Sequence, residues 1–267
     1  MCELLGMSAR RPDSLSASLG ELARHGGLTG PHVDGWGVGL VDDGDALVVR
    51  EPTAASASAW MSFLREHAPP SALVLAHVRR ATQGPRLLRN SQPFARELGG
   101  RMHLFVHNGM LPGIEDDARF AARRFRRIGD TDSEHAFCAL LERLAPAWEA
   151  GVPSVAERHR EVAAFARALA TLGPANFLYT DGDVLFAHGH RRRGDDGVLR
   201  SPGLHVRCRR CAAAAAGAPG ASASAAVDGD GQEVTLFASV PLTGEAWRPL
   251  AEGELLVARA GRLIDVT

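Results

Sequence analysis

The sequence has little that would tie it to a membrane, a nucleic acid or the cell exterior. Its 30 basic residues nearly balance 31 acidic ones, giving a formal charge of −1, so no global field attracts nucleic acid or an anionic membrane. No run approaches the roughly 18 uncharged apolar residues of a membrane span, and Arg10 and Arg11 precede any signal-like apolar segment. These absences predict a cytoplasmic protein that binds neither nucleic acid nor membrane.

Cysteine is also scarce, and four residues are too few and too unevenly spaced for a secreted disulfide framework. Reduced thiols are therefore expected. The stretch RCRRC forms one C-x2-C pair, which is a weak zinc signal because a structural site needs four ligands. We predict a surface loop there, with no metal and no cofactor, and a core position for the cysteine in the helical pattern of residues 131–144. The four cysteines are Cys2, Cys138, Cys208 and Cys211.

The order of periodic segments predicts strands, then helices, then strands, which favours stacked sheets with helices outside. Residues 131–134 have the spacing of a capping box before one helix, and a second helix is expected over 154–172. Asp181 and Gly182 suit a two-residue hairpin turn. A single domain over 1–267 is expected, with a low-complexity insertion at about 211–232. The expected strands are 2–7, 36–41, 46–50, 73–78, 103–107, 204–206, 234–240, 255–258 and 263–266.

The opening MCELLGM places a cysteine directly behind the initiator methionine. Because Cys2 is small, removal of Met1 is expected, and the mature chain would carry a free thiol and a free amine on one residue. Such a residue can combine a nucleophile with its own base. The alternative is that Cys2 is a small buried hydrophobic residue, as free cysteine usually is.

An arginine pair ends the apolar strand of AHVRRATQG. Successive strand residues point to opposite faces, so Arg79 and Arg80 cannot both enter one cleft. One of them could bind a carboxylate through the planar guanidinium fork. The other should face solvent or play a structural part.

Two further stretches have both a structural and a functional interpretation. In FVHNGML, Asn108 and Gly109 are either a hairpin turn or a pair of donors to a developing oxyanion. In TDSE, Asp132 either belongs to a helix cap or holds a ligand's ammonium group near the helix N-terminus. The residues alone leave both choices open.

Several motifs occur together in one order, and together they resemble the class II glutamine amidotransferases. These enzymes have the fold of the N-terminal-nucleophile hydrolases, and the chain is most similar to the stand-alone, YafJ-like group. The resemblance implies an α+β fold with a four-layer αββα sandwich of two antiparallel sheets. The motifs are MCELLGM, TGPHVDGWGVGL, AHVRRATQGPRLLRNSQPF, VHNGML and GDTDSEHAFCALL, with a weaker match at SVPLTGEAW.

The resemblance also implies roles for individual residues. Cys2 would be the nucleophile, with its own α-amine as general base. Glutamine would be held by its α-carboxylate and its α-ammonium group, and two donors would stabilise the oxyanion. These roles fall on Arg79 for the carboxylate, Asp132 for the ammonium, and Asn108 with Gly109 for the oxyanion, while Arg80, Thr82 and His107 would line the pocket.

The implied reaction is cleavage of the glutamine side-chain amide through a γ-glutamyl thioester, with release of ammonia. No acceptor domain is visible after about Asp181, so the acceptor could belong to a separate enzyme. One alternative is hydrolysis of another γ-glutamyl amide, such as the ergothioneine-pathway intermediate that relatives process. Another is a non-catalytic or metal-binding module that keeps the fold.

Overall fold

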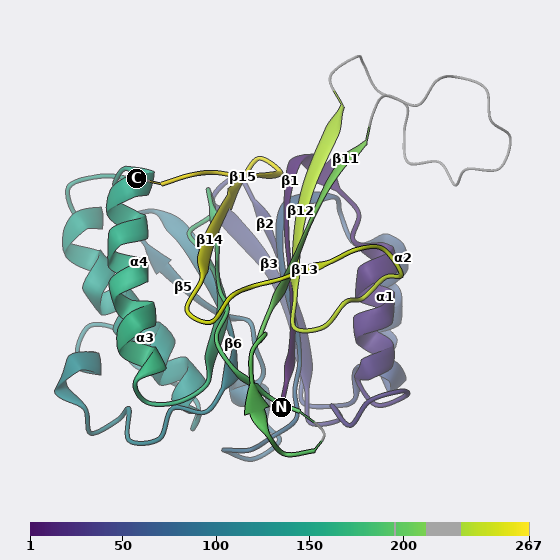
Figure 1. Ribbon diagram of the computed structural model, residues 1–267, viewed down its shortest axis with the longest axis horizontal. Coiled ribbons are helices and arrows are strands. Elements are labelled where there is room, and N and C mark those ends of the chain that lie inside the picture. The colour runs from purple at the N-terminus through teal and green to yellow at the C-terminus, as the bar shows by residue number, and fades with distance from the viewer. Residues whose placement is uncertain (195, 212–230, 267) are drawn as a thin grey trace, which may run out of the picture.

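Two antiparallel sheets lie face to face between two pairs of helices, as Figure 1 shows for the computed structural model. The structure describes residues 1–194, 196–211 and 231–266. The expected four-layer αββα sandwich is confirmed. Most of the expected insertion, residues 212–230, lies outside the described residues. None of the described helices is long and apolar enough to cross a membrane.

The first sheet has the order β13-β11-β12-β1-β4-β2-β3. Its central strand β1 pairs with β12 on one side and β4 on the other. The residue before β1 therefore lies in the middle of the row formed by the strand ends of this sheet. The strands are β1 (Glu3–Asp13), β2 (Trp36–Asp42), β3 (Asp45–Glu51), β4 (Ser71–Val78), β11 (His205–Cys211), β12 (Gln232–Ala238) and β13 (Arg248–Pro249).

The second sheet has the order β15-β14-β8-β7-β6-β5, and a separate two-stranded ribbon pairs β10 with β9. The strands of this sheet are β5 (Phe94–Leu98), β6 (Arg101–Gly109), β7 (Ala175–Thr180), β8 (Leu185–His188), β14 (Leu255–Arg259) and β15 (Arg262–Leu263). The ribbon consists of β9 (Arg192–Arg193) and β10 (Leu199–Arg200).

Side-chain alternation along the strands creates three apolar layers. In β1, Leu5 and Met7 pack toward the helices, whereas Leu4 packs against the second sheet. Helices α1 and α2 cover the first sheet and α3 and α4 cover the second (Figure 1). The helices are α1 (Ser16–His25), α2 (Ala59–His67), α3 (Asp132–Trp148) and α4 (Val155–Ala170), with short 3-10 turns η1 (Ala55–Ala57), η2 (Leu88–Asn90) and η3 (Ala118–Phe120). Cys138 is buried in α3, as expected.

Three local expectations were wrong. The stretch RCRRC, expected as a surface loop, forms the end of strand β11 and pairs with β12. The predicted capping box before α3 is only half formed, because the Glu134 carboxylate accepts the N–H of Gly129 at 2.6 Å instead of that of Thr131. A complete box begins α4 at Ser154. The connection between β7 and β8 also spans the four residues 181–184 and not two.

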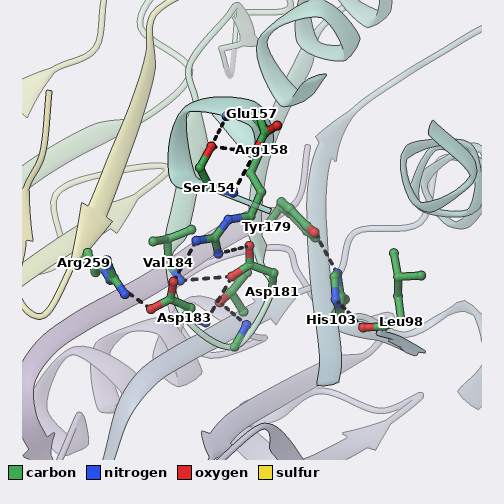
Figure 2. A network of polar contacts seen from close by, with 12 residues as sticks. Leu98, His103, Ser154, Glu157, Arg158, Tyr179, Asp181, Asp183, Val184 and Arg259 are labelled. Atoms are coloured by element: carbon green, nitrogen blue, oxygen red, sulfur yellow. Dashed lines mark hydrogen bonds and ion pairs between the residues drawn. The ribbon is translucent and has the colours of Figure 1, made fainter. Parts of the chain in front are cut away.

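A buried ion pair explains the longer connection. The Asp181 carboxylate binds the Arg158 guanidinium at 2.8 Å and accepts the N–H groups of Asp183 and Val184, both at 3.1 Å. Asp183 in turn binds Arg158 and Arg259 (Figure 2). The network joins α4 to the β7–β8 connection and to β14, so it fixes the helix layer on the second sheet.

Candidate active site

Cys2 lies at the start of the central strand and lines a large cavity. The register of β1 on β4 places Glu3 opposite Val78, which brings residues 79 and 80 beside the thiol. The backbone N–H of Arg80 donates to Cys2 Sγ at 3.4 Å, and Sγ lies 3.4 Å from the Arg80 carbonyl oxygen. Burial raises the pKa of the Cys2 thiol above its ordinary value, and the nearby charge of Arg79 opposes this rise.

The two arginines occupy different environments, as their alternation predicts. The Arg79 guanidinium is buried and donates to the carbonyls of Gln83 at 2.7 Å and Gly84 at 3.0 Å. It is not among the residues that line the cavity, whereas Arg80 is. A substrate carboxylate would have to displace loop carbonyls to reach Arg79, so the role of Arg79 stays a prediction.

The end of β6 carries His107, Asn108 and Gly109 to the same region. Asn108 and Gly109 are paired with β7, so the interpretation of this pair as a hairpin turn is wrong. The buried Asn108 places Nδ2 3.3 Å from Ser239 Oγ, and Gly109 lines the cavity of Cys2. The His107 ring lies 2.9 Å from Ser133 Oγ and does not line this cavity, and burial lowers its pKa.

Asp132, the first residue of α3, lines a second cavity of about 360 Å³. Its Oδ2 accepts the N–H of Leu111 at 2.8 Å, and its Oδ1 accepts the N–H of Ser133 at 2.7 Å. The negative charge of Asp132 acts on Cys2 and raises the thiol pKa, so the two residues lie within electrostatic reach. Thr82, Met110 and Pro112 line both cavities, which therefore adjoin.

A polar cluster under the N-terminus was not anticipated from the sequence. Glu3 binds His25 at 2.6 Å and Arg192 at 3.1 Å. His32 Nε2 lies 2.7 Å from the Met1 carbonyl oxygen. His32 falls in the quoted stretch TGPHVDGWGVGL, but neither its spacing nor its type indicates that role. The Glu3 hydrogen bond raises the pKa of His25.

Two further positioning residues were also missed. Gln92 brackets β6, because its Oε1 accepts the N–H of His107 at 2.6 Å and its amide donates to the His107 carbonyl at 3.3 Å. Ser239 bridges Asn108 and β1, since its hydroxyl accepts the Leu4 N–H at 3.1 Å. Both occur in quoted motifs, SQPF and SVPLTGEAW. The Gln92 contacts depend on the pairing of β5 with β6, and the contact of Ser239 with Asn108 forms only once the two sheets are stacked.

Only one member of the cysteine pair in the tail, Cys208, has a described side chain. Cys208 Sγ lies 3.7 Å from Thr235 Oγ1, and the Cys211 side chain lies outside the described part of the chain. Within the residues that the structure describes, no group of three or more histidine, cysteine or acidic residues could hold a metal ion.

A four-layer sandwich with Cys2 at the start of its central strand defines the N-terminal-nucleophile type of fold. The glutamine phosphoribosylpyrophosphate amidotransferase from B. subtilis is similar in fold, with a TM-score of 0.59 at 16% identity over 98% of this chain and 48% of that one. A crystal structure described as a predicted glutamine amidotransferase from Pseudomonas aeruginosa PA01 is also similar. Its TM-score is 0.67 at 29% identity, over 99% of this chain and 100% of that one.

The sequence comparisons agree with the structural ones. The family described as glutamine amidotransferases class-II matches residues 1–267, and the chain belongs to this family. YafJ of Escherichia coli (strain K12), named as a candidate glutamine amidotransferase, is 34% identical over 95% of this chain and 96% of its own length. A similarly named protein of Haemophilus influenzae is 30% identical over 99% and 86%.

Proposed function

We propose that the chain is a glutamine amidotransferase or glutaminase-type amidohydrolase with Cys2 as its nucleophile. It would cleave the side-chain amide of glutamine through a γ-glutamyl thioester and release ammonia for an acceptor, which a separate enzyme could supply. The observation that carries the proposal is the arrangement of the two adjoining cavities, one lined by Cys2 and Gly109 and the other by Asp132. We also propose that residues 1–267 form one domain.

The chemistry follows from placing a thiol and an amine on one residue. After removal of Met1, a thiol with an ordinary pKa near ~8.5 and an α-amine near ~7.7 to 8.0 exchange a proton at little cost. The thiolate attacks the amide carbonyl, and Asn108 with the N–H of Gly109 stabilises the oxyanion. Ammonia leaves with a proton from the ammonium group, and water hydrolyses the thioester to glutamate.

Asp132 is suited to the α-ammonium group of the substrate. An ionised carboxylate offers about four lone-pair sites. Three are used here, by the N–H of Leu111, the N–H of Ser133 and the Ser133 hydroxyl at 3.2 Å. The remaining site and the negative charge can bind an ammonium group, while Thr82 and the backbone around Arg80 would line the path to Cys2.

Intact mass tests this proposal with an electrophilic glutamine analogue, 6-diazo-5-oxo-norleucine. The purified chain should have lost Met1 and should gain one adduct, which Cys2→Ser lacks. Excess glutamine should protect the wild-type chain. Clean removal of Met1 without an adduct would contradict glutamine recognition at Cys2.

A second candidate is hydrolysis of a γ-glutamyl amide other than glutamine. The observation that favours it is the volume of the Cys2 cavity, about 1290 Å³, which exceeds the ~300 to 1,000 Å³ of common small-molecule sites. A non-catalytic module with the same fold is the third possibility, and absence of any thiol chemistry at Cys2 would favour it.

A further inference from the structure

The cavity beyond Cys2 is strongly basic, and the proposed amide cleavage uses only one end of it. Among the described residues, four arginines and one glutamate line it: Arg80, Arg192, Arg193, Arg200 and Glu3. His25, His32 and His205 line it as well. A neutral ammonia leaving group needs no such field, so the charge of this wall calls for a ligand of opposite sign.

Some of this charge is compensated within the protein. Glu3 binds both Arg192 and His25, and Arg200 binds Asp196. Among the described residues of the wall, Glu3 is thus paired within the cavity, and Arg200 is paired with a carboxylate that does not line it. These contacts leave two arginines to consider.

Within residues 1–194, 196–211 and 231–266, no carboxylate pairs with Arg80 or Arg193. The Arg193 guanidinium donates to the carbonyl of Gly197, which is a neutral partner. For the Arg80 side chain, the described residues contain no hydrogen bond or ion pair. Both side chains lie on the cavity that contains the thiol, and both are exposed, so a ligand can reach them.

The position of the second cavity sets the direction of the substrate. If Asp132 holds the α-ammonium group, the side chain of the γ-glutamyl unit passes Thr82, which belongs to both cavities, and ends at Cys2. Whatever is attached to the amide nitrogen must then continue into the basic part of the Cys2 cavity. Ammonia would leave that part empty.

We propose that the preferred substrate is a γ-glutamyl amide whose amine portion carries a carboxylate or a phosphate group, bound by Arg80 and Arg193. This inference rests on the proposed function of Cys2. In the reaction the Cys2 sulfur bonds to the carbonyl carbon of the γ-glutamyl amide, the C–N bond breaks, and the amine leaves with the proton that the Cys2 α-amine took from the thiol. Water then cleaves the thioester, which gives glutamate and restores the thiol.

Three amides of the same γ-glutamyl unit test the inference. They are γ-glutamylethylamide, which is neutral beyond the amide, γ-glutamylglycine, which carries a carboxylate, and the γ-glutamyl amide of phosphoethanolamine. Glutamate release gives kcat/KM for each, with glutamine alongside. We expect at least one anionic amide to exceed the ethylamide by about tenfold, because charge-assisted bonds to arginine are strong. The better of the two anions identifies the acidic group.

The double variant Arg80→Gln/Arg193→Gln should lower this preference to about onefold to twofold. Arg160→Gln is the matched control, because Arg160 is an exposed arginine of α4 that does not line the cavity. It should keep the wild-type ratio. Salt should weaken the preference in the wild-type chain, since the arginines are exposed to solvent.

Binding to Cys2→Ala, measured by calorimetry with the same amides, keeps the inference separate from turnover. Equal kcat/KM values for neutral and anionic amides, with glutamine still cleaved, would overturn the inference and leave the proposed function intact. If no amide is cleaved, the proposed function fails, and the affinity ratio on Cys2→Ala still decides the inference. Equal affinities there would overturn it as well.

Discussion

Gly109→Ala tests whether the end of β6 must approach β7 as closely as the structure shows. An added Cβ would lie 1.8 Å from the carbonyl oxygen of Pro174, whereas ordinary contacts begin at 3.4 Å. The strand end or the chain at Pro174 must therefore move by the difference, 3.4 − 1.8 = 1.6 Å. The Pro174 oxygen belongs to the backbone, and the backbone of residue 109 fixes the position of the added Cβ. The backbone must therefore take up the movement.

A shift of this size should be far more harmful to catalysis than to folding. Overpacking costs about 1 to 3 kcal/mol, which for a chain of this length lowers Tm by roughly 2 to 12 °C. A 1 Å misplacement of a reacting group can cost about 100-fold in rate, and loss of an oxyanion donor costs about 100- to 1,000-fold. We expect kcat for glutamine hydrolysis to fall by at least about 100-fold in a folded protein.

Glutamate release at saturating glutamine and circular dichroism measure the two effects on one preparation. Gly244→Ala is the matched control, because a Cβ there meets no atom within 4 Å, and it should keep both kcat and Tm. A Gly109→Ala protein with wild-type kcat would refute the assignment of this N–H to the oxyanion. A protein that fails to fold would show that the close approach is chiefly structural.

Three other predictions concern stability and thiol reactivity. Asp181→Ala removes the fully buried one of the two carboxylates that pair with the Arg158 guanidinium, together with the acceptor of two backbone N–H groups, and should lower the unfolding free energy by about 3 to 5 kcal/mol in urea denaturation. A loss below about 1 kcal/mol would contradict the network of Figure 2. The Glu3 hydrogen bond raises the pKa of His25 above 6.5, so its stabilisation is complete below pH 6.5 and is lost as the pH rises through the higher folded value. The stability difference between wild type and His25→Asn should accordingly shrink with rising pH, and a constant difference would show that the pair is not formed. In chains that retain the initiator methionine, burial raises the pKa of Cys2, so peptide mass spectrometry should show iodoacetamide modifying Cys2 more slowly than the exposed Cys208 near pH 8, and equal rates would contradict this.

The layers of the fold were predictable because apolar patterning is local. The strand runs at β1, β2, β4 and β6 and the helical repeat of α3 and α4 all appear in the sequence. Helices α1 and α2 were missed, because α1 has no side-chain cap and α2 leaves Trp60 and Phe63 exposed, which blurs the apolar stripe. Strand β5 was missed since its five residues FAREL mix charges with apolar side chains.

The site was predictable only in part, because its motifs mark residues but not their partners. The proximity of Cys2 to Arg80 depends on the register of β1 on β4. The engagement of Arg79 by the carbonyls of residues 83–85 depends on how a loop folds back on its own strand. The roles of Ser239 and His32 arise from segments 235 and 31 residues away from their partners, and no local pattern encodes such contacts.

The shared wall of the two cavities has a consequence for inhibitor design. Thr82, Met110 and Pro112 belong to both cavities, so a short linker can join two fragments that each occupy one of them. An amino-acid headgroup at Asp132 would raise the effective concentration of an acidic fragment at Arg193 to about the millimolar range. A weakly bound amino-acid headgroup and a weakly bound acidic fragment could thus be combined into one selective ligand that does not react covalently with the thiol.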